Sequence, residues 1–210
     1  GKHISVDFEG VATIADVYLN GDLLANHKGA YTGFSVDITD KVYTDGRENV
    51  LAVRVNSERQ PQLPPEGGNV DYCLFGGIVR DVNMTITNPV HIERVFVTTP
   101  GLTKDSGVVK NCVDILNSSD QGKTYTVETE VLDREGKSVV SVSKQTEIQA
   151  GLWGNVEMTT EAIDNPHLWD VDDPYLYTAV TKIIDGKTII DTYQTRFGMR
   201  FLEFKKGPED

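Results

Sequence analysis

Apolar and polar residues alternate along the chain in short segments, and a helical repeat of apolar positions is nearly absent. In residues 125–131, the side chains of Tyr125, Val127 and Val131 can face a core while the residues between them face water. Residues 34–38 alternate in the same way. Such alternation is typical of strands with one buried face, so the pattern predicts an all-β protein.

Residue pairs that end in glycine mark the expected turns between these strands. Asn20-Gly21 and Asp185-Gly186 each join two apolar segments. Such pairs accept the positive φ angles of tight hairpin turns. Asp45-Gly46 precedes a further strand over residues 50–55, where the connection is either a tight turn or a longer loop.

A proline marks the expected boundary between two domains. A strand predicted to end at Ile86 is followed by Asn88-Pro89 and then by a new strand over residues 92–98. Proline cannot donate to a sheet ladder, so the boundary is placed here. With 210 residues, the chain is long enough for the two domains that this implies, residues 1–88 and 89–197.

Seven strand-like segments follow the boundary, and five or six precede it. The seven lie near residues 92–98, 108–117, 124–132, 138–147, 154–160, 175–184 and 187–196. Seven strands with regular turns and no long helix suit an immunoglobulin-like sandwich. Trp153 and Trp169 are interpreted as core or edge anchors of this sandwich rather than as residues that stack on a ligand.

Charge and hydropathy exclude several classes of function. A net charge of −12 and a pI near 4.7 argue against nucleic-acid binding, which needs clustered Lys and Arg. No apolar run approaches the roughly 20 residues of a membrane helix, so no membrane span is predicted. The first residues carry no signal-peptide pattern. The sequence indicates a soluble protein, for which a periplasmic or secreted location is favoured slightly over a cytoplasmic one.

The cysteines and histidines give no candidate for covalent or metal chemistry. Cys73 and Cys112 fall in different predicted domains, so a disulfide between them is not expected. Cys112 is interpreted as a small buried residue. The four histidines are scattered and show no metal-ligand spacing, so neither a metal nor a cofactor is predicted.

Four motifs carry a resemblance to a known family. In chain order they are Val17-Tyr-Leu-Asn-Gly21, Asp71-Tyr-Cys-Leu-Phe-Gly-Gly-Ile-Val-Arg-Asp-Val82, Asn165-Pro-His-Leu-Trp-Asp-Val-Asp-Asp-Pro-Tyr-Leu-Tyr177 and Arg196-Phe-Gly-Met-Arg200. Together they span nearly the whole chain. They resemble the non-catalytic front half of glycoside hydrolase family 2, the family of β-galactosidases, β-glucuronidases and β-mannosidases.

The resemblance implies an architecture in three parts. Residues 1–88 would be a sugar-binding jelly roll that begins upstream of this chain, since a jelly roll normally has about eight strands. Residues 89–197 would be the immunoglobulin-like β-sandwich, and residues 198–210 resemble the lead-in to a catalytic (β/α)8 barrel. The predicted fold is therefore all-β, a partial jelly-roll sandwich followed by an immunoglobulin-like β-sandwich. Unpaired strand edges invite association, so a homo-oligomer is among the expected partners.

The resemblance places the catalytic acids outside this chain. Retaining glycosidases use two carboxylic acids, and the family carries both on barrel strands. No catalytic residue is therefore predicted within residues 1–210. The acidic pair Asp172-Asp173 is interpreted as part of a turn, and Glu128 and Glu130 as part of a solvated strand face.

The segment 56–75 is the candidate substrate-binding loop, because long loops without secondary structure in compact domains are usually functional or disordered. By the resemblance, Asp71 matches an acid that holds the sugar at the barrel mouth and, in some β-galactosidases, approaches a sodium ion. A carboxylate can accept hydrogen bonds from two sugar hydroxyls. Tyr72 is the second predicted substrate-binding residue. Tyr72 and Phe75 could both line the rim of the pocket, although aromatic residues beside a turn are more often packing residues. The alternative is that Asp71 anchors the loop by pairing with Arg80 or with backbone N–H groups.

Two functions follow from these features. The first is the accessory part of a retaining β-glycosidase, inactive alone, that helps to shape the pocket for a carbohydrate substrate. Gly10-Val11 is followed by Ala12, where lactose-cleaving members have an asparagine, so glucuronides, mannosides and other galactosides stay open. The second is a stand-alone carbohydrate-binding or adhesion module that stacks glycans on Tyr31, Tyr43 and Tyr72. A self-contained module should not begin inside a jelly roll, which favours the first.

Overall fold

The computed structural model describes residues 1–58, 60–64 and 75–202, and every regular element in them is a strand. The all-β fold predicted from the alternation is confirmed. The chain divides into two compact units, Gly1–Thr87 and Asn88–Asp210. In the described ranges, no helix is long and apolar enough to cross a membrane.

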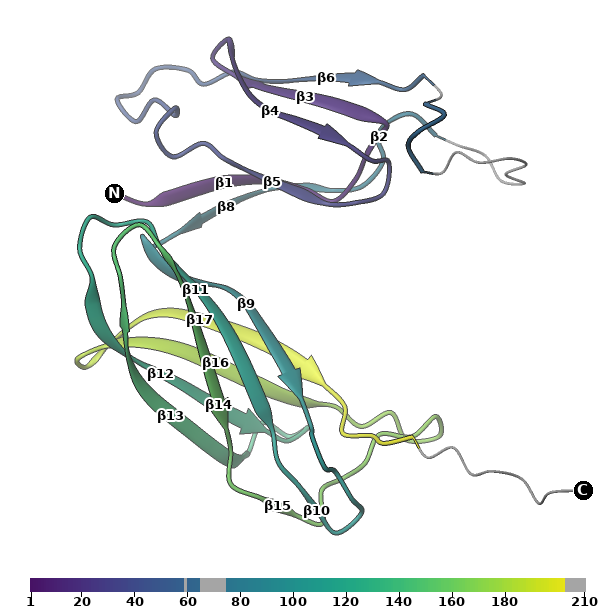
Figure 1. The fold of residues 1–210 in the computed structure, drawn as a ribbon, viewed down its shortest axis with the longest axis vertical. Helices are drawn as coiled ribbons and strands as arrows, with labels where there is room; N and C mark the ends of the chain where they lie inside the picture. Colours follow the sequence, from purple (N-terminus) through teal and green to yellow (C-terminus); the bar gives the residue numbers. More distant parts are fainter. Residues whose placement is uncertain (59, 65–74, 203–210) are drawn as a thin grey trace, which may run out of the picture. The chain divides into compact units, whose positions relative to one another are not determined.

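The described part of the first unit contains eight strands. They are β1 (His3–Phe8), β2 (Val11–Ala12), β3 (Ile14–Leu19), β4 (Asp22–Lys28), β5 (Phe34–Asp37), β6 (Leu51–Asn56), β7 (Gly77–Ile78) and β8 (Val82–Thr87). One antiparallel sheet has the order β5-β1-β8 and a second has the order β4-β3-β6, while β2 pairs with β7. Figure 1 shows the two larger sheets as separate layers.

The turn at Asn20-Gly21 connects β3 to β4 as the sequence predicts. Leu19 pairs with Asp22, which leaves a two-residue loop. Asn20 has a φ of 54° and Gly21 a φ of 95°, the signature of a type I′ hairpin. The turn therefore sets the register of Leu19 and Tyr18 with β4, and the register shifts by one residue between Tyr18 and Val17.

Strand β8 carries apolar side chains that the core leaves uncovered. Val82, Met84 and Ile86, which we call the β8 stripe, are 40%, 63% and 57% exposed. Val82 pairs with Phe8 and Met84 with Val6, and both of these β1 side chains are buried. Cross-strand partners share one face of a sheet, so the β8 stripe continues the core-facing side of β1 to the sheet edge.

The second unit contains nine strands in its described part. They are β9 (Val90–Thr98), β10 (Ser106–Gly107), β11 (Lys110–Asn117), β12 (Lys123–Leu132), β13 (Ser138–Ile148), β14 (Trp153–Thr159), β15 (Ile163–Asp164), β16 (Tyr177–Asp185) and β17 (Thr188–Phe197). A three-stranded sheet has the order β14-β11-β9, a four-stranded sheet has the order β13-β12-β16-β17, and β10 pairs with β15. The longer strands match the seven predicted segments, and the two shortest strands were not predicted.

The core of the second unit follows the predicted alternation. Tyr125, Val127 and Val131 on β12 are all buried. Thr129 has the same phase and is fully buried, and its hydroxyl lies 2.9 Å from the hydroxyl of Thr181 on β16. The pair satisfies two polar groups inside the core, which the sequence of β12 alone could not show.

The two tryptophans have different environments. Trp153 lies on the edge strand β14 and is 64% exposed, so of the two predicted positions, core or edge, the core position is excluded. Val156 and Met158 are the inward-facing residues of β14. Successive side chains of a strand point to opposite faces, and Trp153 is an odd number of residues from both, so it lies on the outer face. Trp169 is half-buried and donates its backbone N–H to Met199 O at 2.8 Å.

We expect Met84→Lys to reduce the binding of the apolar dye ANS to the folded chain. The substitution places a charge in the middle of the β8 stripe, while an exposed side chain contributes little to the melting temperature. Fluorescence titration and thermal unfolding measure the two effects. Leu23→Lys is the control, because Leu23 is 56% exposed on β4, outside the stripe. Equal dye binding by the wild type and Met84→Lys would contradict the conclusion that the β8 stripe is an exposed apolar surface.

Candidate functional site

The segment that carries the two predicted substrate-binding residues is anchored by strands of the first unit. Asp71 and Tyr72 themselves lie outside the described residues. The described anchors are the end of β6 at Asn56 and the start of β7 at Gly77. The geometry of these anchors therefore defines where the segment leaves the sandwich and where it returns.

The start of the segment is hydrogen-bonded to Ala12 at the end of β2 and to Thr13, which follows β2. Ser57 Oγ donates to Ala12 O at 3.0 Å, and Thr13 N donates to Asn56 O at 3.0 Å. The side chain of Asn56 accepts from the backbone N–H of Glu58 at 2.8 Å. These three bonds fix the direction in which the chain leaves β6.

The end of the segment returns to the same place. Gly77 has a φ of 98° and pairs with Ala12 in the β2-β7 ladder. A Cβ atom on Gly76 would lie 2.4 Å from both Cβ and Oγ of Ser57, so only glycine fits there. Both ends are therefore held at Ala12, as in an Ω-loop whose ends lie close together.

The residues after the Gly-Gly pair are mainly structural. The guanidinium of Arg80 lies 6.0 Å from the ring centroid of Tyr31, and its stem packs against Gly10. The carbonyl of Asp81 accepts from the backbone N–H of Glu9 at 3.0 Å. Phe75, which precedes the pair, is 71% exposed, so of its two predicted roles packing is excluded within the described residues and the pocket rim stays a prediction.

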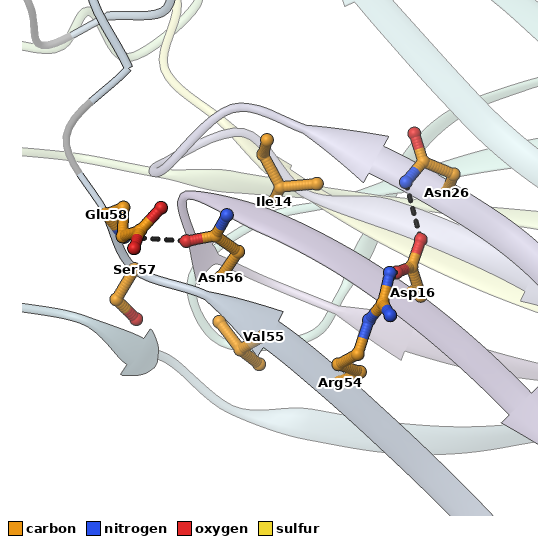
Figure 2. A pocket seen from close by; sticks show the side chains of 8 residues that line it. All are labelled: Ile14, Asp16, Asn26, Arg54, Val55, Asn56, Ser57 and Glu58. Carbon is orange, nitrogen blue, oxygen red and sulfur yellow. Dashed lines mark hydrogen bonds and ion pairs between the residues drawn. The ribbon is translucent and has the colours of Figure 1, made fainter.

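A pocket of about 530 Å³ opens on the β4-β3-β6 sheet, beside the start of the segment. Figure 2 shows its lining side chains, which are Ile14, Asp16, Asn26, Arg54, Val55, Asn56, Ser57 and Glu58. We call it the outer-face pocket, because Ala15 and Val17 point into the core and place Asp16 on the opposite face. No local sequence pattern signals this pocket, since its residues come from three strands.

Asp16 is the ionised centre of the outer-face pocket. Its Oδ1 accepts from Asn26 Nδ2 at 2.6 Å, and its Oδ2 accepts from Arg54 Nε at 2.9 Å and Nη2 at 2.5 Å. The hydrogen bond from Asn26, followed by that from Arg54, holds the pKa of Asp16 below its usual value despite burial. Asp16 is therefore a carboxylate at neutral pH and serves as an acceptor rather than as an acid.

The third sequence motif forms a polar cluster in the second unit. His167 Nε2 lies 2.6 Å from Asp173 Oδ2, and Arg134 Nη2 donates to Asp173 Oδ1 at 2.9 Å. The rings of His167 and Tyr175 stack with centroids 4.0 Å apart, and the Arg134 guanidinium lies 4.3 Å from the Tyr175 centroid. Asp173 is thus engaged in structural contacts, which agrees with its interpretation as part of a turn. We call these residues the Asp173 cluster.

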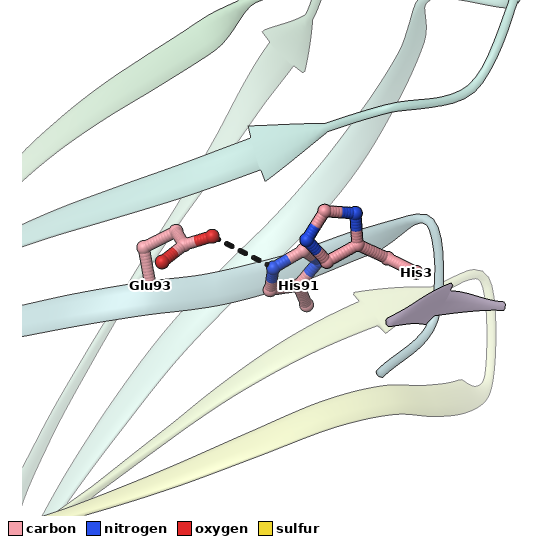
Figure 3. Close-up of side chains that lie close together, drawn as sticks. All are labelled: His3, His91 and Glu93. Atoms are coloured by element: carbon pink, nitrogen blue, oxygen red, sulfur yellow. Dashed lines mark hydrogen bonds and ion pairs between the residues drawn. The ribbon is translucent and has the colours of Figure 1, made fainter. Parts of the chain in front are cut away.

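His91 and Glu93 on β9 form a second acid–imidazole pair, drawn in Figure 3. His91 Nε2 lies 2.9 Å from Glu93 Oε1, and His91 Nδ1 lies 2.9 Å from Asn88 O. Burial lowers the pKa of His91, but the hydrogen bond and charge of Glu93, together with the hydrogen bond to Asn88 and the charge of Asp191, raise the pKa above its usual value. The protonated form of His91 therefore stabilises the fold. This contribution to the free energy of unfolding is fully present below about pH 6.5 and is lost as the pH rises through the pKa of His91 in the folded chain.

Two tyrosines proposed for glycan stacking already have partners. The Arg47 guanidinium lies 3.7 Å from the ring centroid of Tyr43. Tyr31 is 39% exposed and faces Arg80. Tyr72, the third of the set, lies outside the described residues.

Comparison with family models places most of the chain in one family. Residues 90–200, more than half of the chain, match the model described as "Glycosyl hydrolases family 2". Residues 1–70 match the model described as "Glycosyl hydrolase 2 galactose-binding domain-like".

Curated relatives and solved structures agree with these matches. A β-galactosidase from Thermoanaerobacter pseudethanolicus is 38% identical, over 98% of this chain and 27% of that protein. A β-glucuronidase from Bacteroides fragilis is 32% identical, over 96% of this chain and 29% of that protein. The chain therefore spans less than a third of the length of these relatives.

The solved structures are similar over nearly the whole chain. A glycosyl hydrolase family 2 member from Bacteroides cellulosilyticus has a TM-score of 0.87 and 32% identity, covering 97% of this chain and 27% of that one. A β-glucuronidase from Bacteroides uniformis has a TM-score of 0.90 and 25% identity, covering 97% and 25%.

We expect Glu93→Gln to lower the pKa of His91, because the substitution removes the charge that offsets burial. An NMR titration of the His91 ring measures the change, and the loss of stability with rising pH should become smaller. Glu128→Gln is the matched control, since Glu128 lies on β12 and pairs with Lys182. An unchanged His91 pKa in Glu93→Gln would show that Glu93 is not the cause of the raised value.

Proposed function

The chain belongs to glycosyl hydrolases family 2, and we propose that it is the accessory part of a retaining β-glycosidase. In this proposal the chain helps to shape the substrate pocket of a catalytic barrel, and the barrel supplies both catalytic acids. The substrate is a β-linked carbohydrate. The match of the chain to less than a third of each relative's length supports this division of labour.

The observation that carries the proposal is the anchoring of both ends of the segment 56–75 at Ala12. A loop with fixed ends loses less conformational freedom when it orders against a ligand than one with free ends. The anchors therefore favour a defined binding position for the segment. In the proposal, Asp71 accepts hydrogen bonds from sugar hydroxyls and Tyr72 lines the same subsite.

The proposed substrate class is broad. The relatives of the chain include a β-galactosidase and a β-glucuronidase. Ala12 stands where lactose-cleaving members have an asparagine, and its side chain is only 3% exposed. An alanine offers a ligand no polar side-chain group. We therefore propose that lactose is not the preferred substrate, and that glucuronides, mannosides and other galactosides are the candidates.

The alternative of a stand-alone adhesion module has less support. It needs exposed rings for stacking on sugars, whereas an arginine lies over Tyr43 and another faces Tyr31. A homo-oligomer stays a prediction, supported by the exposed β8 stripe at a sheet edge.

The isolated chain should hydrolyse no glycoside, because the proposal assigns both catalytic acids to the barrel. The measurement is release of the chromophore from aryl β-galactoside, β-glucuronide and β-mannoside by the purified chain. A preparation of the chain with Arg47→Ala serves as the contamination control. Turnover above the buffer blank that persists after repurification would contradict the proposal.

In an intact enzyme that contains this chain, we expect Asp71→Ala to lower kcat/KM. Loss of a hydrogen bond to a charged group costs about 1.5–3 kcal/mol, which corresponds to roughly one to two orders of magnitude. The melting temperature should stay unchanged if Asp71 contacts substrate. Asp45→Ala is the matched control, since Asp45 pairs with Arg47 on an exposed loop.

A local structural role of Asp71 gives the opposite pattern. The melting temperature then falls while kcat/KM per folded enzyme is kept. That pattern would remove Asp71 from the substrate site and leave Tyr72 as the one residue of the loop that is assigned to it.

A further inference from the structure

The outer-face pocket combines the apolar side chain of Ile14 with polar groups at two ends. Ile14 pairs with Asn56 across β3 and β6 and therefore lies beside the second of these ends, among the side chains drawn in Figure 2. One end is formed by the side chains of Asp16, Asn26 and Arg54. The other end is formed by Asn56, Ser57 and Glu58 at the start of the substrate-binding segment.

Strand register explains this arrangement. Asp16 pairs with Asn26 on β4 and with Arg54 on β6, so the first end is one row across the sheet. Ile14 pairs with Asn56 and forms the next row on the same face. Two residues along a strand span about 7 Å, so the two rows lie side by side on the sheet, and Ile14 supplies the apolar surface within the second row.

The polar groups offer both donors and acceptors to a ligand. Arg54 uses two of its five N–H groups on Asp16, and Asn26 uses one N–H, which leaves its carbonyl oxygen as an acceptor. The Oδ1 atom of Asn56 is fixed by the Glu58 N–H, so its amide N–H groups are directed elsewhere. Glu58 adds a carboxylate. Hydroxyl groups both donate and accept, so a polyhydroxylated ligand suits this mixture.

The charge of the lining selects among polyhydroxylated ligands. Of the charged lining residues, Asp16 and Arg54 are paired with each other, which leaves the carboxylate of Glu58, while Lys28 pairs with Ile14 on the β4 side, outside the lining. The carboxylate of Glu58 disfavours uronates and phosphorylated sugars at its end of the pocket and leaves neutral sugars unaffected. The volume of about 530 Å³ is within the usual range for small-molecule sites.

We propose that the outer-face pocket binds a neutral saccharide. The sugar ring lies over Ile14, and its hydroxyls bond to Arg54 and Asn26 at one end and to Asn56 and Glu58 at the other. This site goes beyond the proposed function, because its described lining belongs to β3, β4, β6 and the two residues after β6, and because binding in the pocket requires no barrel. It would hold part of a glycan that extends away from the cleavage site, or a separate glycan chain.

The plain alternative is a solvated polar ladder that only stabilises the sheet. Such a ladder explains the contacts of Asp16 with Asn26 and Arg54. It gives Glu58 no role, because Glu58 lies beyond the end of β6 and is exposed. Substitution of Glu58 therefore separates the two interpretations without threatening the fold.

The test is saccharide binding by the purified 210-residue chain. Methyl β-galactoside and methyl β-glucoside are the neutral probes, glucuronate is the charged probe, and saturation-transfer NMR with calorimetry measures affinity. We expect millimolar binding of a neutral probe and clearly weaker binding of glucuronate. Glu58→Ala and Arg54→Ala should each weaken the binding of the neutral probe about tenfold.

Two controls keep the result specific to the pocket. Arg47→Ala removes an arginine that pairs with an aspartate elsewhere in the first unit, and should leave affinity unchanged. Asp71→Ala should also leave it unchanged, so failure of the pocket inference and failure of the proposed function can be told apart. The inference is overturned if no neutral probe binds, or if binding persists in folded Glu58→Ala and Arg54→Ala.

Discussion

The contact between Gly76 and Ser57 is the constraint on which the candidate site depends. Any Cβ at position 76 would overlap the Ser57 side chain, and Ser57 is itself bonded to Ala12. Because Gly77 pairs with the same Ala12, the segment 56–75 leaves and returns at one point on the sandwich. Gly76 is therefore required by the approach of Ser57 and Gly77 by its positive φ, and both fix the base of the loop.

The third motif has a comparable role in the second unit. His167 and Arg134 both bond to Asp173, and both pack on Tyr175, so the Asp173 cluster ties the stretch after β15 to the end of β12. The hydrogen bond from Arg134, followed by that from His167, holds the pKa of Asp173 below its usual value. Asp173 therefore stays charged at neutral pH, and its contribution to stability is lost only as the pH falls through that lowered pKa. Two of the family motifs thus act as anchors.

The sequence predicted the features that depend on local pattern. The seven longer strands of the second unit and the Asn20-Gly21 hairpin follow from alternation and turn chemistry within a few residues. The outer-face pocket was not predicted, because Arg54 lies 38 residues from its partner Asp16 and only strand register joins them. The exposure of Trp153 was not predicted, because tryptophan is usually a packing residue and the outer face of β14 is set by the alternation that buries Val156 and Met158.

The proposed contribution of the segment 56–75 to the substrate pocket of a family 2 β-glycosidase is open to a direct test. The measurement is a crystal structure of an intact enzyme that contains this chain, with a substrate analogue bound in the barrel. We expect a carboxylate oxygen of Asp71 to lie within hydrogen-bonding distance, about 2.5–3.0 Å, of a hydroxyl of the sugar at the cleavage site. A structure in which the sugar is bound and Asp71 instead pairs with Arg80, away from the sugar, would contradict the proposal.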